Sequence, residues 1–287
     1  MRASKTAEVV TAARAHHYKT RQPALFPDHL AYSLCNRYWK IILGSRLLTF
    51  IIVDLLLQKL LPVTPEIIVR ARYCEDHVER VVRNGVDQFV IIGAGFDSFA
   101  LRRTDLMKDL TVYEIDSPAS QSAKIRRLQA AGLEVPGGLV FVSADLNVVN
   151  LHDAIAEAGF DHGRPAVFSW FGVTYYLPRE TVDRTLADIS ERCAAGSAVL
   201  FDYIAEPSWT DPKFRELQER CAAYVARKGE PWICMFEPDE ITGLLERSGF
   251  TDIEHLAPDM AESRYERSRL DADYPAFMGL CMASMEE

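Results

Sequence analysis

Two glycines and an acid, set at the ends of successive apolar runs, are the residues of this sequence best suited to hold a nucleoside. Gly93 and Gly95 follow the apolar run at residues 89–92, and Asp116 ends the next run about twenty residues later. A glycine turn lets the backbone approach a ligand closely, and a carboxylate can accept hydrogen bonds from both ribose hydroxyls. The spacing therefore predicts a nucleoside-cofactor site at the carboxyl ends of two parallel strands.

The side chains just after the glycines separate S-adenosylmethionine from a dinucleotide. Ser98 stands where a dinucleotide fingerprint has its third glycine, and Asp97 adds a carboxylate inside the loop. That charge would repel a pyrophosphate, whereas it would attract the ammonium and sulfonium groups of S-adenosylmethionine. Asp97 could also cap a helix, and the two roles can coexist. An NAD-dependent oxidoreductase is the alternative.

Residues next to the glycines and to Asp116 are also candidates for the lining of the predicted cofactor site. Ala94 lies between the two glycines and Ser117 follows the acid, so both are predicted to line the site. Glu114 lies two residues before Asp116 and therefore points to the same face of its strand. Glu114 could share the work of Asp116 or pair with Arg102.

The third and fourth apolar runs of the pattern also end on candidate ligand contacts. The Asp145 carboxylate could accept from the adenine amino group and the Leu146 amide could donate to a ring nitrogen, although Asp145 could equally be a turn residue. Phe171 could lie against the cofactor, and Gly172 lets the chain pass close to it.

Tyr175 and Tyr176 are the candidate catalytic residues, since either hydroxyl could be aimed at a substrate. Packing in an aromatic core is the alternative for each ring. No histidine stands in these motifs, which favours an acceptor that needs no general base, such as a carboxylate or an acidic phenol.

Strand-like and helix-like runs alternate from about residue 89 to residue 282, which predicts an α/β fold with a mostly parallel sheet covered on both faces. We expect the last two of seven strands to form a hairpin. The predicted strands are residues 89–92, 111–115, 139–142, 166–170, 198–203, 251–256 and 277–282. The predicted helices between them are residues 117–131, 150–158, 179–194, 212–227 and 238–248.

The first 80 residues are predicted to be helical and to form a cap, or lid, over a domain at residues 81–287. Helices are expected at residues 4–18, with Ser4 as the cap, and at residues 66–83. The apolar segment at residues 41–61 contains three charged residues, so it predicts one or two amphipathic helices and no membrane span. Its apolar face could belong to the core, to a substrate pocket, to a homodimer interface or to a contact with a membrane.

The composition of the chain limits the kinds of partner and the cellular location that we expect for the protein. The net charge of −9 argues against nucleic acid, which requires a basic surface. Six cysteines without a CxxC pair, and no expected signal peptide, indicate reduced thiols in a cytoplasmic protein. His16 and His17 have no acid or cysteine at ligand spacing, so we expect no metal site.

Taken together, the motifs resemble the leucine carboxyl methyltransferase-like family, and most of all its bacterial S-adenosylmethionine-dependent O-methyltransferases. The resemblance implies a class I, Rossmann-like methyltransferase fold with S-adenosylmethionine as cofactor, and it implies that Arg70 binds the methionine carboxylate. It also matches Arg14 to a basic position on the family's lid helix. The matching segments include residues 4–7, 27–31, 69–72, 85–88, 93–97, 113–116, 144–146 and 172–178.

One departure bears on the acceptor. Many members of the family carry a glutamate where this chain has Phe171, so the contacts of their acceptors do not carry over, and a protein tail is not the expected substrate. We therefore expect O-methylation of a carboxylate or hydroxyl on a hydrophobic small molecule. A non-catalytic protein that binds S-adenosylmethionine and regulates or scaffolds is a further alternative.

Overall fold

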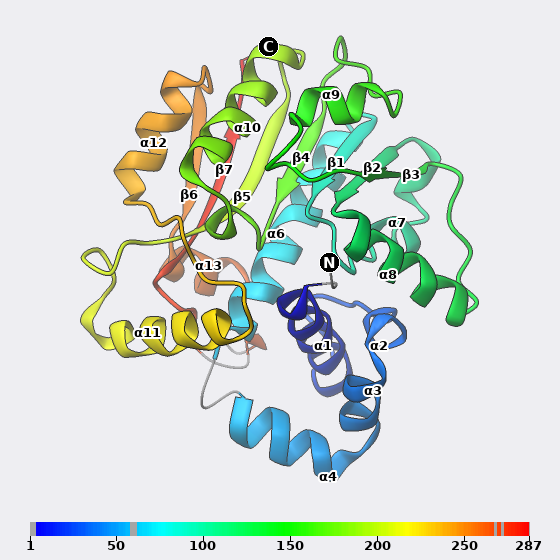
Figure 1. The fold of residues 1–287 in the computed structure, drawn as a ribbon, viewed down its shortest axis with the longest axis vertical. Coiled ribbons are helices and arrows are strands. Elements are labelled where there is room, and N and C mark those ends of the chain that lie inside the picture. The colour runs from blue at the N-terminus through cyan, green and yellow to red at the C-terminus, as the bar shows by residue number, and fades with distance from the viewer. Residues whose placement is uncertain (1–3, 58–61, 267–268, 271–272, 287) are drawn as a thin grey trace.

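A seven-stranded sheet with helices on both faces forms the main body of the molecule, and a group of helices covers one end of it (Figure 1). The computed structural model describes residues 4–57, 62–266, 269–270 and 273–286. The strand order is β3-β2-β1-β4-β5-β7-β6. The strands are β1 (Gln88–Ile92), β2 (Thr111–Asp116), β3 (Leu139–Ser143), β4 (Val167–Trp170), β5 (Ala198–Ile204), β6 (Asp252–Leu256) and β7 (Met278–Ser284).

The first five strands are parallel, as predicted, and β7 runs antiparallel to both of its neighbours. All residues of β1 and β5 are buried, because helices cover both faces of the sheet. Alternate residues of β1 enter opposite cores: Val90 packs on one side and Phe89 on the other. The predicted mostly parallel α/β sheet is thus confirmed.

The last two strands differ in detail from the prediction. They are antiparallel neighbours, but α13 (Pro258–Arg264) lies in their connection, so they do not form a tight hairpin. Helix α13 was not predicted from the sequence, because the helix is short and the residues on either side of it have the composition of a loop. β7 lies between β5 and β6, so β6 is the edge strand at this end of the sheet and β3 is the edge strand at the other end.

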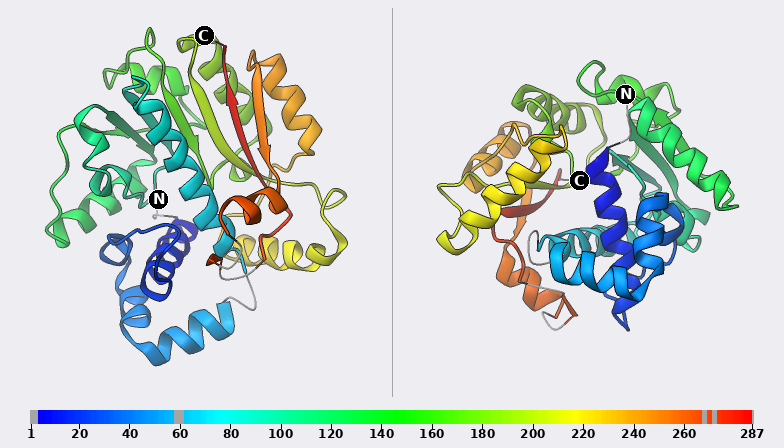
Figure 2. Two further views of the ribbon diagram at one scale, coloured as in Figure 1. Left: turned by 180° about the vertical axis from the view of Figure 1, so that it is seen from behind. Right: turned by 60° about the horizontal axis from the view of Figure 1, so that its bottom comes forward.

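Two layers of helices enclose the sheet (Figures 1 and 2). One apolar core includes side chains of α10 (Arg179–Arg192) and α12 (Pro238–Arg247), and the core of the opposite face includes side chains of α6 (Thr64–Val82). The remaining helices of this part of the chain are α7 (Phe99–Arg102), η2 (Leu106–Lys108), α8 (Pro118–Ala130), α9 (Leu151–Ala156), η3 (Thr174–Tyr176) and α11 (Pro212–Arg227).

The N-terminal residues are helical, as the sequence predicts. Ser4 caps the first helix, since its Oγ accepts from the amide of Ala7. Residues 58–61 of the apolar segment lie outside the described residues, and no described helix has the length and apolarity to cross a bilayer. The helices are α1 (Lys5–Thr20), α2 (Ala31–Leu34), α3 (Arg37–Gly44), α4 (Arg46–Leu48) and the π-type helix η1 (Thr49–Leu57).

We propose a division into a cap at residues 1–80 and a domain at residues 81–287. Helix α6 spans this boundary and packs on the sheet, whereas α1 lies between the sheet and α3 (Figure 1). The chain leaves β1 toward β2 on one side and returns through β4 on the other, so a crevice forms at the carboxyl ends of β1 and β4. This crevice is where the candidate site lies.

Candidate active site

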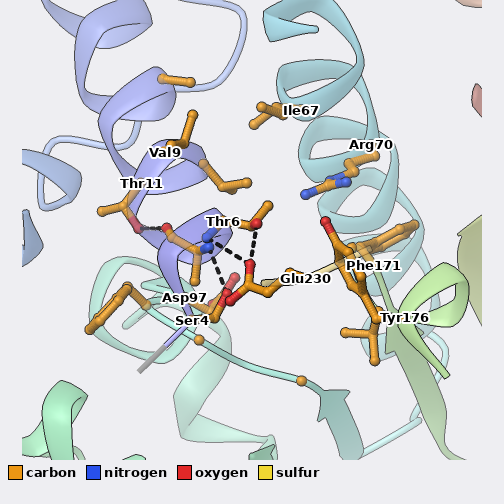
Figure 3. Close-up of a pocket in the computed structure, with 18 of the residues that line it drawn as sticks. Ser4, Thr6, Val9, Thr11, Ile67, Arg70, Asp97, Phe171, Tyr176 and Glu230 are labelled. Carbon is orange, nitrogen blue, oxygen red and sulfur yellow. Dashed lines mark hydrogen bonds between the residues drawn. The ribbon is translucent and has the colours of Figure 1, made fainter. Parts of the chain in front are cut away.

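A cavity of about 770 Å³ lies between α1, α6 and the carboxyl ends of the central strands (Figure 3). Its volume falls in the usual range for small-molecule sites. Of the thirteen residues predicted to act at the site, all but Leu146 line this cavity. These twelve are Arg70, Gly93, Ala94, Gly95, Asp97, Asp116, Ser117, Asp145, Phe171, Gly172, Tyr175 and Tyr176.

The glycine turn has no room for a side chain at its first position. Gly93 has a φ of +72°, and a Cβ built there would lie 2.3 Å from Cγ2 of Val173. The amides of Gly93 and Ala94 both donate to the carbonyl of Ile115, at 2.8 and 3.0 Å. The turn is therefore held against β2, and its bare backbone forms part of the cavity wall, as close approach of a ligand requires.

The acid at the end of β2 is held by backbone amides. The two carboxylate oxygens of Asp116 accept from the amides of Gly95 and Ser117, each at 2.6 Å. Burial raises the pKa of Asp116, and these hydrogen bonds oppose the rise. Each oxygen keeps a further lone pair, so the carboxylate can still accept from two hydroxyls on the cavity side.

Glu114 does not pair with Arg102, which was one of the two alternatives that the sequence left open for it. Glu114 instead forms a buried ion pair with Lys124 of α8, and Arg102 pairs with Glu75. Helix α8 follows β2 directly and packs beside it, which brings Lys124 over the strand. Burial raises the pKa of Glu114 to about 7, against the opposing charge of Lys124. Glu114 is thus engaged away from the cavity, and of these two acids Asp116 is the one that lines it.

Asp97 stabilises the start of a helix, as one of its two alternatives predicts, and it also lies at the cavity. Its Oδ1 accepts from the amide of Phe99 at 2.6 Å, which stabilises the start of α7, while the residue also lines the cavity. Its Oδ2 lies 3.7 Å from Nη1 of the buried Arg14 in α1, and Arg14 donates to the carbonyl of Phe96 at 2.7 Å. Arg14 thereby attaches the first helix to the glycine turn.

Ser98 has a structural function that a third glycine could not supply. Its hydroxyl donates to Oδ2 of Asp28 at 2.8 Å and accepts from Nε of Arg102 at the same distance. Ser98 is fully buried in this network and does not line the cavity. The residue that departs from the dinucleotide pattern therefore joins α7 to the segment after α1.

Asp145 and Leu146, the two residues predicted to contact the adenine, differ in their surroundings: Asp145 lines the cavity and Leu146 does not. Oδ1 of Asp145 accepts from the amide and the side chain of Asn147, both at 3.0 Å, so Asp145 also stabilises a turn. The side chain of Leu146 is buried in the core, and its carbonyl accepts from Arg184. Any ligand contact of Leu146 must therefore come from its backbone.

Arg70 lies between two acids. Its Nη1 is 2.5 Å from Oδ2 of Asp202 and 3.1 Å from Oε1 of Glu66, and all three side chains are buried. Oδ1 of Asp202 accepts from the amide of Gly172 at 2.7 Å. Burial raises the pKa of Glu66 to about 8, with Asp202 adding to the rise and Arg70 opposing it. Glu66 is therefore mostly protonated near neutral pH, which balances the charge of this cluster.

The sequence reasoning missed Asp202. A carboxylate within the apolar run of β5 was the available signal, because a buried charge requires a partner. Its partner, Arg70, is 132 residues away in the chain. Through Gly172, Asp202 also positions the loop that carries Phe171, which lines the cavity near Arg70 (Figure 3).

The two candidate catalytic tyrosines are neutral phenols. Burial, with Asp202 next, raises the pKa of Tyr175 well above its ordinary value, and burial raises the pKa of Tyr176 to about 12. The two rings pack edge to face, with centroids 4.7 Å apart. Either hydroxyl could donate a hydrogen bond, but neither would act readily as a base near neutral pH.

Two further cavity residues come from outside the predicted motifs. Glu230 follows α11 and accepts from the amides of Lys5 and Thr6, at 3.0 and 3.1 Å, and from the Thr6 hydroxyl (Figure 3). His16 has its Nε2 2.9 Å from Oδ1 of Asp54. No local signal indicates either contact, since both join distant segments.

The histidine pair considered for a metal is divided between other contacts. His16 faces Asp54, whereas Nε2 of His17 accepts from the amide of Leu25 at 3.1 Å. Among the described residues, no group of three or more His, Cys, Asp or Glu side chains could hold a metal ion.

The strand order, with β7 inserted antiparallel beside β5, is that of the class I methyltransferase fold, and the cavity lies at the switch point of the sheet. The chain belongs to the leucine carboxyl methyltransferase family, whose match covers residues 7–190. Over 93% of each chain it is 32% identical to a Bacillus subtilis (strain 168) protein named "Putative S-adenosyl-L-methionine-dependent methyltransferase YktD".

Solved structures of low sequence identity share the fold. The "putative methyltransferase" from Thermobifida fusca YX has a TM-score of 0.60 and 18% identity, over 96% of this chain and 94% of that one. A DUF574 family protein from Streptomyces avermitilis MA-4680 has a TM-score of 0.61 and 14% identity, over 96% and 97% of the two chains. S-adenosylmethionine is accordingly the cofactor, and the family favours it over the nicotinamide alternative.

Proposed function

We propose that this methyltransferase acts on an oxygen atom, a carboxylate or a hydroxyl, of a hydrophobic small molecule. The observation that carries the proposal is the two-sided lining of the cavity. Backbone and carboxylates at the strand ends form one side, and apolar side chains of α1, α3, η1 and α6 form the other. The apolar side includes Val9, Trp39, Val53, Leu57 and Ile67.

The polar side fits the cofactor by its chemistry. Gly93, Ala94 and Gly95 would line the methionine and ribose, and the Asp116 carboxylate, with Ser117 beside it, would hold the ribose hydroxyls. When bound, S-adenosylmethionine supplies an electrophilic methyl group. The bare backbone at Gly93 supports this assignment, because a side chain there would collide with Val173.

The methionine and adenine ends have their own proposed contacts. Arg70 would bind the methionine carboxylate, and protonation of Glu66 makes this easier because it removes one negative charge that would repel the incoming carboxylate. Asp97 would attract the ammonium group. Asp145 and the backbone of Leu146 would contact the adenine. Phe171 and Gly172 would close the cofactor against the loop after β4.

The acceptor atom decides which further groups are needed. A carboxylate is ionised near neutral pH and needs no base. A hydroxyl needs one, and His16, paired with Asp54 at the cavity wall, is the side chain suited to take that proton. The role proposed for Tyr175 and Tyr176 is to orient the acceptor oxygen by hydrogen bonds, since their phenols stay protonated.

Methyl-labelled cofactor and acceptors that share one apolar skeleton, ending in a carboxylate, a phenol or an amine, test the proposal. We expect label on the carboxylate or the phenol. Transfer only to the amine would contradict O-methylation. Binding of S-adenosylhomocysteine without transfer to any acceptor would support the non-catalytic alternative. The His16→Asn variant then separates the acceptors, because it should slow transfer to the phenol and leave transfer to the carboxylate unchanged.

A narrowing substitution tests where the acceptor binds. Val53→Trp should raise the KM for an apolar acceptor and leave the affinity for S-adenosylhomocysteine unchanged, because Val53 lines the apolar side. Val135→Trp, at an exposed site outside the cavity, is the matched control.

The six free thiols support a cytoplasmic location for the reaction.

A further inference from the structure

The cap helices carry an apolar outer surface, here called the cap face. Seven of the thirteen exposed large hydrophobic side chains in the described part of the chain lie within residues 38–56, with exposed fractions between 40% and 67%. The other six are spread over five separate segments of the chain. Clustered exposure of this kind marks an interaction site. The cap face consists of Tyr38, Ile41, Leu47, Phe50, Ile51, Leu55 and Leu56.

The cap face is the outer side of amphipathic helices whose inner side packs in the core and lines the cavity. Trp39 and Ile42 of α3 and Val53 of η1 are buried against α1. Trp39 and Val53 also line the cavity. These helices form the end of the molecule away from the sheet (Figures 1 and 2). The cap face is therefore separated from the acceptor side of the cavity by the thickness of one helix.

The charges around the cap face are basic, although the whole chain carries a net charge of −9. Residues 37–57 contain Arg37, Lys40 and Arg46 and a single acid, Asp54. The carboxylate of Asp54 is partly exposed and lies 2.9 Å from Nε2 of His16. Arg37 and Arg46 are exposed. The cap face thus combines aromatic and aliphatic side chains with exposed cations.

This combination is complementary to an anionic lipid surface. Amphipathic helices that lie in a bilayer interface insert aromatic and aliphatic side chains below the headgroups and keep cations at the level of the phosphates. A second copy of the chain is a poorer fit, because a two-fold contact places the same patch on both sides, and the only acid of residues 37–57, Asp54, already faces His16, which leaves Arg37 and Arg46 without an acid of the patch to pair with. We propose that the cap face docks on the surface of an anionic bilayer without crossing it.

Vesicle flotation of the purified full chain tests the proposal. We expect the protein to float with vesicles of phosphatidylcholine and phosphatidylglycerol, and to bind vesicles of phosphatidylcholine alone at least tenfold more weakly. Added salt should weaken the binding, because the attraction to anionic headgroups is screened. Failure to bind either vesicle would overturn the proposal, and so would equal binding to both.

Paired variants locate the contact. Leu47→Ser with Phe50→Ser should abolish flotation, and Arg37→Gln with Arg46→Gln should weaken it by about fivefold for each arginine removed. Trp209→Ser with Met260→Ser is the matched control, since both residues are exposed apolar side chains elsewhere on the molecule. Flotation that survives the Leu47 and Phe50 changes would contradict the assignment.

Cofactor binding and oligomeric state separate lipid docking from misfolding and from self-association. All variants should bind S-adenosylhomocysteine as the parent chain does, which shows that they are folded and that the cofactor site does not take part in docking. Light scattering gives the oligomeric state. A dimer that dissociates in the Leu47 and Phe50 variant, together with no vesicle binding by the parent, would assign the cap face to a second copy and overturn the lipid proposal.

Discussion

Gly93 is the residue at which the cofactor site tolerates least change. Replacing it with alanine adds a Cβ 2.3 Å from the Val173 side chain at a φ of +72°. The backbone conformation alone costs about 1–2 kcal/mol, and the collision should add about 1–3 kcal/mol. We expect Gly93→Ala to lower the free energy of unfolding by the sum and to abolish binding of S-adenosylhomocysteine, measured by chemical denaturation and calorimetry.

A control separates the collision from the backbone strain. Gly85→Ala has a φ of +96° and meets no atom within 4 Å, so it should show the backbone cost alone. Adding Val173→Ala to Gly93→Ala should recover part of the lost stability, because the two side chains compete for one space. Equal losses for Gly93→Ala and Gly85→Ala would show that the space at Val173 is not limiting.

Glu66 makes the stability of the protein depend on pH. Its pKa is raised by burial from 4.5 to about 8, so the folded chain holds a proton that the unfolded chain releases. The contribution to stability is fully present below about pH 4.5 and is lost as the pH rises through about 8. Glu66→Gln keeps a neutral side chain at all pH values and should flatten this part of the profile.

The measurement is denaturant unfolding of the parent chain and the variant across this pH range. As the pH is raised, the free energy of unfolding should fall more for the parent chain than for Glu66→Gln. The difference between the two values should therefore grow from the difference measured at low pH. Glu219→Gln, on the exposed surface of α11, should follow the parent profile. Parallel profiles for Glu66→Gln and the parent would mean that the buried cluster does not take up this proton.

At the scale of elements, the contact between α1 and the segment after α11 holds the first helix over the cavity. Glu230 accepts from two amides of the first turn of α1 and from the Thr6 hydroxyl, and the Lys5 ammonium donates to the carbonyl of Lys228 at 3.2 Å. A carboxylate at a helix N-terminus is favoured by the helix dipole. All four of these residues line the cavity, so the contact forms part of its wall.

Removing the Glu230 carboxylate should therefore loosen the lid. Hydrogen bonds to a charged group contribute about 1.5–3 kcal/mol, so Glu230→Ala should speed the dissociation of S-adenosylhomocysteine by about tenfold, measured by stopped-flow competition. Glu216→Ala, an exposed acid on α11 itself, should leave the rate unchanged. An unchanged rate in Glu230→Ala would show that α1 does not gate release.

At the scale of the whole molecule, the cofactor should stabilise the fold because it joins the sheet to the cap. S-adenosylhomocysteine at about 100 times its Kd should stabilise the chain by about 2.7 kcal/mol and raise Tm by roughly 4–8 °C. NADH at the same concentration should not. A larger shift with NADH in differential scanning fluorimetry would reverse the choice of cofactor, and Gly93→Ala should show no shift with either compound.

The sheet and its strand ends were predictable because they depend on local sequence. Strands buried on both faces must be continuous apolar runs, so Gly93 and Asp116 could be placed at strand ends from their neighbours alone. The partner of Glu114 could not be predicted in this way. Its partner Lys124 is only ten residues away, but the pairing depends on how α8 packs beside β2.

The sequence by itself determined the alternation of strands and helices, the glycine turn, the acids that follow the strands and the amphipathic cap, since each follows from burial and turn chemistry over a few residues. Only the tertiary structure decided which charges meet. Arg70 with Asp202, Glu230 with Thr6 and His16 with Asp54 join segments far apart in the chain. Such contacts form only when packing brings the segments together, and each of them places a side chain in the wall of the cavity.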